Sequence, residues 1–83
     1  MNPTTDIYDA AAAEAQYVVQ RDCGGEFGYK GGGSRRWGSL DEAVPVDLPT
    51  AFGIAADAAR GNSGVRVVRV VEVPTIKRIA EAL

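Results

Sequence analysis

The sequence predicts a small α+β domain: a mostly antiparallel β-sheet with one main α-helix packed on a face and short helices at both termini. Three observations predict this fold class. Residues 17–30 contain two β-rich stretches around a pair of glycines, residues 48–60 carry a helical apolar stripe, and residues 65–73 hold six valines in nine positions. The 83 residues suffice for one small domain, so 1–83 is expected to form a single unit.

The first segment, 1–15, is predicted to be helical. Thr5 can cap a helix, Asp6 suits its positive end, and the alanines that follow have the lowest cost of helix formation. Its large apolar side chains are few, Ile7 and Tyr8 among them. An isolated helix this short is marginal, so we expect it to dock on the sheet, to pack on a second copy, or to fray.

Residues 16–73 are predicted to form the core, which begins with a β-hairpin. The stretch "YVVQRD" is β-branched and aromatic, and it is followed by two glycines and then by "EFGYK". Phe27 and Tyr29 share a face because side chains alternate along a strand. Both are therefore predicted to point into the core.

The strongest helix signal follows a turn at "SLDEA" (39–43). Asp47 is placed to cap this helix, Pro49 is tolerated in its first turn, and Gly61 can end it in a left-handed conformation. Its apolar stripe is predicted to face the sheet and consists of Leu48, Phe52, Ala55, Ala56 and Ala59.

The valine-rich stretch 65–73 is predicted to be a central strand. Val68 and Val70 point to one face and most of the other valines to the opposite face, so both faces need apolar cover. We expect the second cover to come from a terminal helix or a partner subunit. A homodimer that buries Val68 or Val70, or the terminal helices, is predicted. The end of the chain, 74–83, is predicted to form a helix whose inner face is Ile76, Ile79, Ala80 and Leu83.

Several classes of chemistry are excluded by composition. The chain has no histidine, which is the commonest general base and transition-metal ligand, and its one cysteine cannot build a thiolate metal site. The stretch "GYKGGGS" is not a Walker loop, because its lysine precedes the glycines. We therefore expect no catalytic residue, no metal and no cofactor. A lone cysteine, no apolar run of about 18 residues and no leader sequence favour the cytosol and no membrane contact.

Charge is distributed unevenly along the chain, and two binding hypotheses follow from it. Lys30, Arg35 and Arg36 form a basic, glycine-rich loop that could hold nucleic acid, with Trp37 beside them. Against this, the net charge is −2, and Trp37, the only tryptophan, is better explained as a core residue. The sequence thus disfavours direct nucleic-acid binding.

The second hypothesis is a partner-binding acidic surface. Residues 39–57 carry acids and no base, and acids spaced a few ångströms apart could contact a basic protein surface as DNA phosphates do. This hypothesis is slightly preferred, and its residues are Asp41, Glu42, Asp47 and Asp57.

The succession "YVVQRDCGGEFGYKGGGSRRWGSLDEAVPVDLPTAFGIAADA…VRVVRVVEV" resembles small proteins common in bacteriophages and other mobile elements. It covers residues 17–73. Phage-encoded anti-CRISPR proteins, including inhibitors of type I systems, are similar small sheet-plus-helix proteins. The resemblance implies a non-enzymatic inhibitor in the host bacterial cytosol that binds a CRISPR–Cas effector complex and blocks DNA recognition. The alternatives are a mobile-element accessory protein that contacts nucleic acid through the basic loop, and a structural homo-oligomer.

Overall fold

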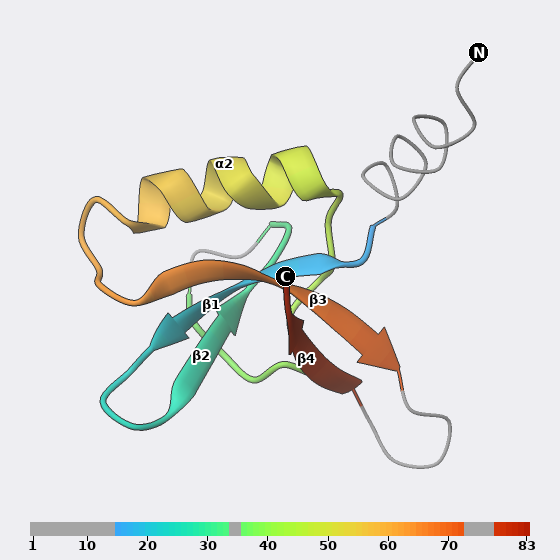
Figure 1. The fold of residues 1–83 in the computed structure, drawn as a ribbon, viewed down its shortest axis with the longest axis horizontal. Helices are drawn as coiled ribbons and strands as arrows, with labels where there is room; N and C mark the ends of the chain where they lie inside the picture. Colours follow the sequence, from blue (N-terminus) through green and yellow to red (C-terminus); the bar gives the residue numbers. More distant parts are fainter. Residues whose placement is uncertain (1–14, 34–35, 73–77) are drawn as a thin grey trace.

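The structure, a computed structural model, describes residues 15–33, 36–72 and 78–83. Four antiparallel strands form one sheet in the order β2-β1-β3-β4, and one helix packs on it (Figure 1). The predicted α+β class is confirmed. The elements are β1 (Tyr17–Asp22), β2 (Phe27–Lys30), α2 (Leu48–Ala58), β3 (Val65–Glu72) and β4 (Arg78–Ala82).

The predicted hairpin is confirmed, with Asp22 paired opposite Phe27. Gly24 and Gly25 adopt φ angles of 79° and 105°, which glycine tolerates without steric cost. The Asp22 carboxylate accepts hydrogen bonds from both of their N–H groups, at 3.1 and 3.2 Å. The prediction that Phe27 points into the core is wrong: its side chain is 55% exposed, because it lies beside the turn at the end of the hairpin. Tyr29 does pack against the core.

Helix α2 begins as predicted, and the prediction of its buried stripe is correct only in part. The Asp47 side chain caps it by accepting a hydrogen bond from the Thr50 N–H at 2.9 Å. The buried face contains Ala51 and Ala58, whose small side chains let the helix lie close to the sheet, while Phe52 is 53% exposed. Leu48 and Ala55 of the predicted stripe do pack against the core, whereas Ala56 and Ala59 are exposed. Gly61 is not among the glycines with positive φ, so the predicted left-handed helix end is also wrong.

Apolar clusters occupy both faces of the sheet. On the face covered by α2, here called the helix face, the buried cluster is Tyr17, Ala51 and Val67, with Val46, Leu48 and Ala55 packed around it. On the opposite face, here called the loop face, the cluster is Val18, Ala43, Val68 and Val70, with Tyr29, Leu40 and Ala80 packed around it.

The central position of β3 and its two apolar faces are as predicted, but the expected source of the second cover is wrong. The segment around Leu40 and Ala43 covers Val68 and Val70 instead of a terminal helix or a partner subunit. Arg78 holds this segment in place by donating to the carbonyl oxygens of Leu40 at 3.4 Å and Ala43 at 2.8 Å. Because Val68 and Val70 are buried within the chain, they offer no surface to the predicted homodimer.

The helix predicted over 74–83 is wrong for residues 78–82, which form strand β4. Five residue pairs join β4 to β3, and the pairing brings Arg78 within 3.5 Å of Glu72 and Glu81 within 3.3 Å of Arg69. A helix of about ten residues is marginal in isolation, so the tertiary pairing outweighs the local preference. The predicted N-terminal helix, residues 1–14 of 1–15, lies outside the described residues, as do 73–77.

Candidate functional site

A short segment extends the sheet beyond β2 and places Trp37. Tyr29 and Gly38 exchange two backbone hydrogen bonds, each of 2.9 Å. In this antiparallel register Trp37 stands opposite Lys30 and shares the helix face with it. A Cβ at Gly28 would lie 3.0 Å from the Trp37 Cβ, so the indole side chain rises directly over the bare backbone of β2. Helix α2 covers β1 and β3, which leaves β2 to be covered by Trp37.

Two cations lie over the indole ring of Trp37. The Arg21 Cζ atom is 5.7 Å from the ring centroid and the Lys30 Nζ atom is 5.2 Å from it, both within cation–π range. Arg21 pairs opposite Gly28, so β1 and β2 each contribute one cation to the same ring. The prediction that Trp37 is a core residue is wrong: its burial is intermediate, and it belongs to neither core cluster.

The glycine run beyond β2 has a structural reason. A Cβ at Gly31 would lie only 1.9 Å from the Val44 carbonyl oxygen, so the two backbone segments cross where no side chain fits. The Gly32 N–H donates to that same oxygen at 2.8 Å, and Gly33 has a φ of 74°. The run therefore anchors the loop that follows Lys30 and is not itself a ligand cradle.

A hollow of about 170 Å³ opens beside Trp37 at this edge of the sheet. Lys30 and Arg36 line it together with Glu42, so the structure brings together members of both predicted sets. The Glu42 Oε2 atom would lie 3.1 Å from a Cβ at Gly38, which places the carboxylate at the rim. Arg35 lies outside the described residues. We call Arg21, Lys30, Arg36 and Trp37 the Trp37 edge.

The four predicted acidic residues do not form one surface. Asp41 and Glu42 are exposed on the turn that covers the loop face, whereas Asp57 is exposed on α2, across the sheet. Asp47 has a structural role as the helix cap. Hydrogen bonds from the Thr50 side chain and backbone lower the pKa of the Asp47 carboxyl below its ordinary value. Only Asp41 and Glu42 remain close together.

The other cations of the sheet are already paired with carboxylates or amides. Arg69 lies 3.3 Å from Glu81 and Arg78 lies 3.5 Å from Glu72, while Arg66 donates to the Gln20 side chain. The two cations over the indole differ, because a cation–π contact attracts a charge without neutralising it. Arg21 and Lys30 therefore keep their positive charge beside Trp37.

Arg21 was missed as a candidate, although the sequence contained a signal for it. A hairpin that turns at the two glycines pairs Asp22 with Phe27 and hence Arg21 with Gly28. A cation opposite a bare glycine has room for a large neighbour, which Trp37 provides. The hairpin register was needed to make that inference.

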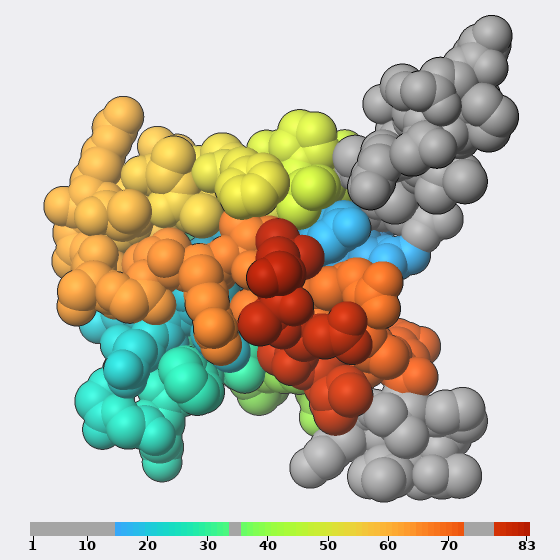
Figure 2. Space-filling view, viewed as in Figure 1, coloured from blue at the N-terminus to red at the C-terminus, as the bar shows by residue number. Residues whose placement is uncertain are grey.

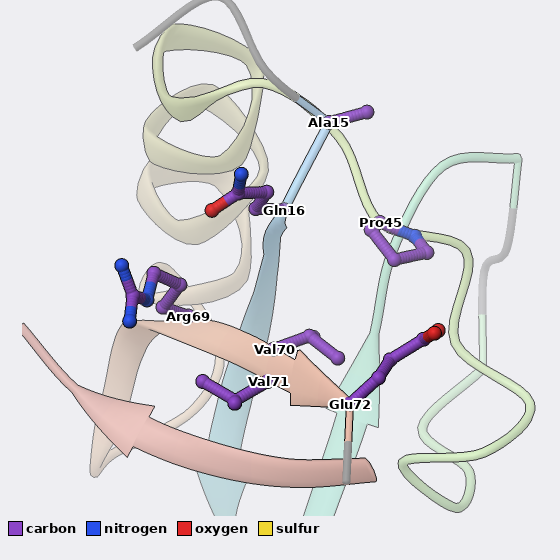
Figure 3. Close-up of a pocket in the computed structure, with 7 residues that line it drawn as sticks. All are labelled: Ala15, Gln16, Pro45, Arg69, Val70, Val71 and Glu72. Atoms are coloured by element: carbon purple, nitrogen blue, oxygen red, sulfur yellow. The ribbon is translucent and has the colours of Figure 1, made fainter. Parts of the chain in front are cut away.

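A larger hollow, of about 360 Å³, lies where β1 begins and β3 ends (Figure 3). Arg69 and Glu72 stand at its two sides, and Figure 3 shows their side chains pointing away from each other. Arg69 is already engaged by Glu81. These two side chains do not point toward a common position, as the general acid and general base of a catalytic pair must.

The described ranges 15–33, 36–72 and 78–83 also bear on metal binding and on membrane insertion. They contain no group of three or more histidine, cysteine, aspartate or glutamate residues that could hold a metal ion. No helix within them is long and apolar enough to cross a membrane. No protein-family model matches the chain, and comparisons with curated proteins and with solved structures find no match.

Proposed function

We propose that the chain is a non-enzymatic binding protein that contacts single-stranded nucleic acid through the Trp37 edge. The observation that carries this proposal is the pair of cations, Arg21 and Lys30, held over one partly buried indole. Phosphate binding requires several cations that are not already neutralised, and bases of any sequence can stack on an aromatic ring. Both kinds of group are present here on two paired strands.

The reason for preferring the acidic surface no longer holds. That preference assumed that Trp37 was buried in the core, and the ring instead lies at the sheet edge among cations. The acidic set, in turn, is divided between two faces of the sheet. The geometry therefore favours the basic edge over the acidic one.

The size of the hollow supports binding along an edge. Pockets for drug-sized ligands measure about 300–1,000 Å³, whereas the hollow beside Trp37 measures about 170 Å³. An extended strand lying across the edge needs only a shallow surface and repeated phosphate contacts. The composition also supports a non-enzymatic role, because the chain has no histidine to act as a general base.

A second candidate function is inhibition of a CRISPR–Cas effector or a related bacterial defence complex by protein contact, in the host cytosol. One observation favours it: Asp41 and Glu42 are exposed on a turn, and neither takes part in a salt bridge among the described residues. Hydrogen bonds from Arg78 to the backbone hold this turn against the sheet, so the positions of the two carboxylates are restricted. A basic partner surface would suit them.

The test uses the single tryptophan as its reporter. A short single-stranded oligonucleotide of mixed sequence should quench Trp37 fluorescence, and affinity should fall on the order of tenfold between about 50 and 200 mM salt as counterions compete. Lys30→Glu should abolish binding. Arg60→Glu is the matched control, because Arg60 is exposed beyond the end of α2 and the charge change is the same.

The nucleic-acid proposal would be refuted if the affinity did not depend on salt concentration. It would also be refuted if Lys30→Glu and Arg60→Glu weakened binding equally. The inhibitor candidate predicts the opposite order with a purified effector complex. Asp41→Lys combined with Glu42→Lys should then abolish inhibition, and Lys30→Glu should leave it intact.

A further inference from the structure

Strand β4 leaves one edge of the sheet open. At the opposite edge, β2 is extended by the bridge between Tyr29 and Gly38. Among the described residues, β4 pairs only with β3. Figure 2 shows the red C-terminal residues at the surface, below α2. Within the described ranges 15–33, 36–72 and 78–83, the outer side of β4 is therefore an unpaired strand edge.

The backbone groups on that edge follow from the hydrogen-bond pattern. The Val70 N–H donates to the Gln16 carbonyl at 2.7 Å, so the backbone of Val70 points toward β1. Because successive residues of a strand point their backbone groups to opposite sides, Val71 points toward β4, where its partner is Ile79. The backbone groups of Arg78, Ala80 and Ala82 consequently point outward.

This edge lacks the devices that usually prevent strand pairing. Edge strands are commonly protected by proline, bulges or charged side chains. Strand β4 contains no proline, and its two charged residues are engaged by β3: Arg78 with Glu72, and Glu81 with Arg69. Its remaining side chains are apolar.

Exposed apolar side chains lie beside the open edge. Ile79 is 45% exposed and Leu83 is 67% exposed, and Phe52 of α2 is 53% exposed. Phe52 and Leu83 line a hollow of about 420 Å³ between the helix and the end of β4. Alternation along β4 places Ile79 and Leu83 on the helix face, with Glu81, which pairs with Arg69, between them.

We infer that β4 pairs with β4 of a second copy, antiparallel about a two-fold axis at Ile79, to form a continuous eight-stranded sheet. This inference does not depend on the proposed nucleic-acid binding. In this register Ile79 meets Ile79 of the second copy, and Arg78 lies opposite Ala80, whose small side chain leaves it room. Arg78 and Ala80, two of the three outward-pointing residues, exchange backbone hydrogen bonds with Ala80 and Arg78 of the second copy.

Charge favours a second copy in this register. The two Glu81 side chains are four residues apart along the strands, or about 14 Å, so like charges do not meet. Centring the pairing on Glu81 would place the two carboxylates directly opposite each other, which is destabilising. The segment is thus self-complementary about Ile79: isoleucine meets isoleucine at the centre, and the two Glu81 carboxylates are kept apart. A two-fold axis requires this property of a dimer surface.

Sedimentation equilibrium tests the assembly. We expect the mass to rise with concentration toward twice the monomer mass of 8.7 kDa. Ala80→Pro removes an outward N–H without touching the β3 pairing, and should remain monomeric throughout that range with an unchanged circular dichroism spectrum. A monomeric wild type at every concentration, or a folded Ala80→Pro variant that dimerises equally well, overturns the inference.

Crosslinking tests the register and does not depend on the proline variant. In a Cys23→Ser background, Ile79→Cys should form an intermolecular disulfide on mild oxidation, because directly opposite Cβ atoms in such a pair are about 4.5 Å apart. Glu81→Cys is the matched control on the same face, and at about 14 Å it should not crosslink. Equal crosslinking of both variants, or of neither, overturns the inference.

Discussion

Gly28 and Trp37 form a complementary pair: the Cβ of Trp37 occupies the space that a side chain at Gly28 would need, 3.0 Å from the position of its Cβ. The missing side chain on β2 lets the tryptophan lie against the strand. That contact holds the indole beside Arg21 and Lys30. A glycine that contacts no ligand is therefore a structural requirement of the candidate binding edge.

Gly28→Ala should displace Trp37 and destabilise the protein. The new methyl group would press on the Trp37 Cβ and, at 3.2 Å, on the Cys23 sulfur, and such overpacking costs about 1–3 kcal/mol. Urea unfolding followed by Trp37 fluorescence measures the change. Gly53→Ala provides the matched control. Its Cβ would meet nothing within 4 Å on α2, so it should stabilise the protein by about 0.5–1 kcal/mol. Equal changes in the free energy of unfolding for Gly28→Ala and Gly53→Ala would contradict the close contact between Gly28 and Trp37.

Trp37→Ala should cost less than the loss of a core aromatic. Removing a buried tryptophan costs about 3–5 kcal/mol, and Trp37 is only partly buried outside both core clusters, so we expect roughly half of that. Urea unfolding monitored by circular dichroism measures it. A loss as large as the full core value would restore the original prediction that Trp37 is a core residue.

The cation–π contact can be measured separately from burial. A double-mutant cycle of Arg21→Gln and Trp37→Leu should give a coupling free energy of about 0.5–1 kcal/mol, the usual value for an exposed pair. The same cycle with Arg60→Gln in place of Arg21→Gln should give a coupling near zero. If the two cycles agree, the ring does not attract Arg21 specifically.

Strands β1, β2 and β3 and helix α2 could be predicted because each has a local pattern that suits its tertiary role. Strand β4 could not, because its stretch "RIAEA" has the composition of a helix, and only the free edge of β3 makes it a strand. The prediction that Phe52 faces the sheet was wrong because helical spacing does not distinguish two adjacent positions. A buried helix face that contains Leu48 and Ala55 can include either Ala51 or Phe52. The close approach of α2 to the sheet selects the smaller residue.

The candidate site was only partly predictable. Lys30 and Arg36 were identified from composition, whereas Arg21 required the hairpin register. The prediction that the four acidic residues form one surface was wrong for a different reason. Nearness along the chain does not specify a face, and the sheet lies between Asp57 and the pair formed by Asp41 and Glu42.

Acid should weaken the start of α2. The pKa of Asp47 is lowered in the folded state, chiefly by the hydrogen bond from the Thr50 side chain. A carboxyl group whose pKa is lowered by folding stabilises the protein above its unfolded pKa, here about 3.8, and the stabilisation is lost as pH falls through the folded value. Thermal unfolding should show wild type more stable than Asp47→Ala at neutral pH, with the difference shrinking below pH 3.8. A difference that persists unchanged in acid would contradict the role of the ionised cap.

Glu42→Gln should strengthen the binding of single-stranded nucleic acid. Glu42 lines the same hollow as Lys30 and Arg36, so its carboxylate repels an incoming phosphate and competes for those cations. Exposed charge interactions contribute about 0.2–1 kcal/mol, which corresponds to a gain in affinity of up to about fivefold. Glu72→Gln makes the same change in net charge beside Arg78, at the opposite side of the sheet. Fluorescence titrations at fixed salt should therefore show tighter binding for Glu42→Gln and little change for Glu72→Gln. If both variants gain equally, affinity depends on net charge alone, and the nucleic acid does not bind at the hollow beside Trp37.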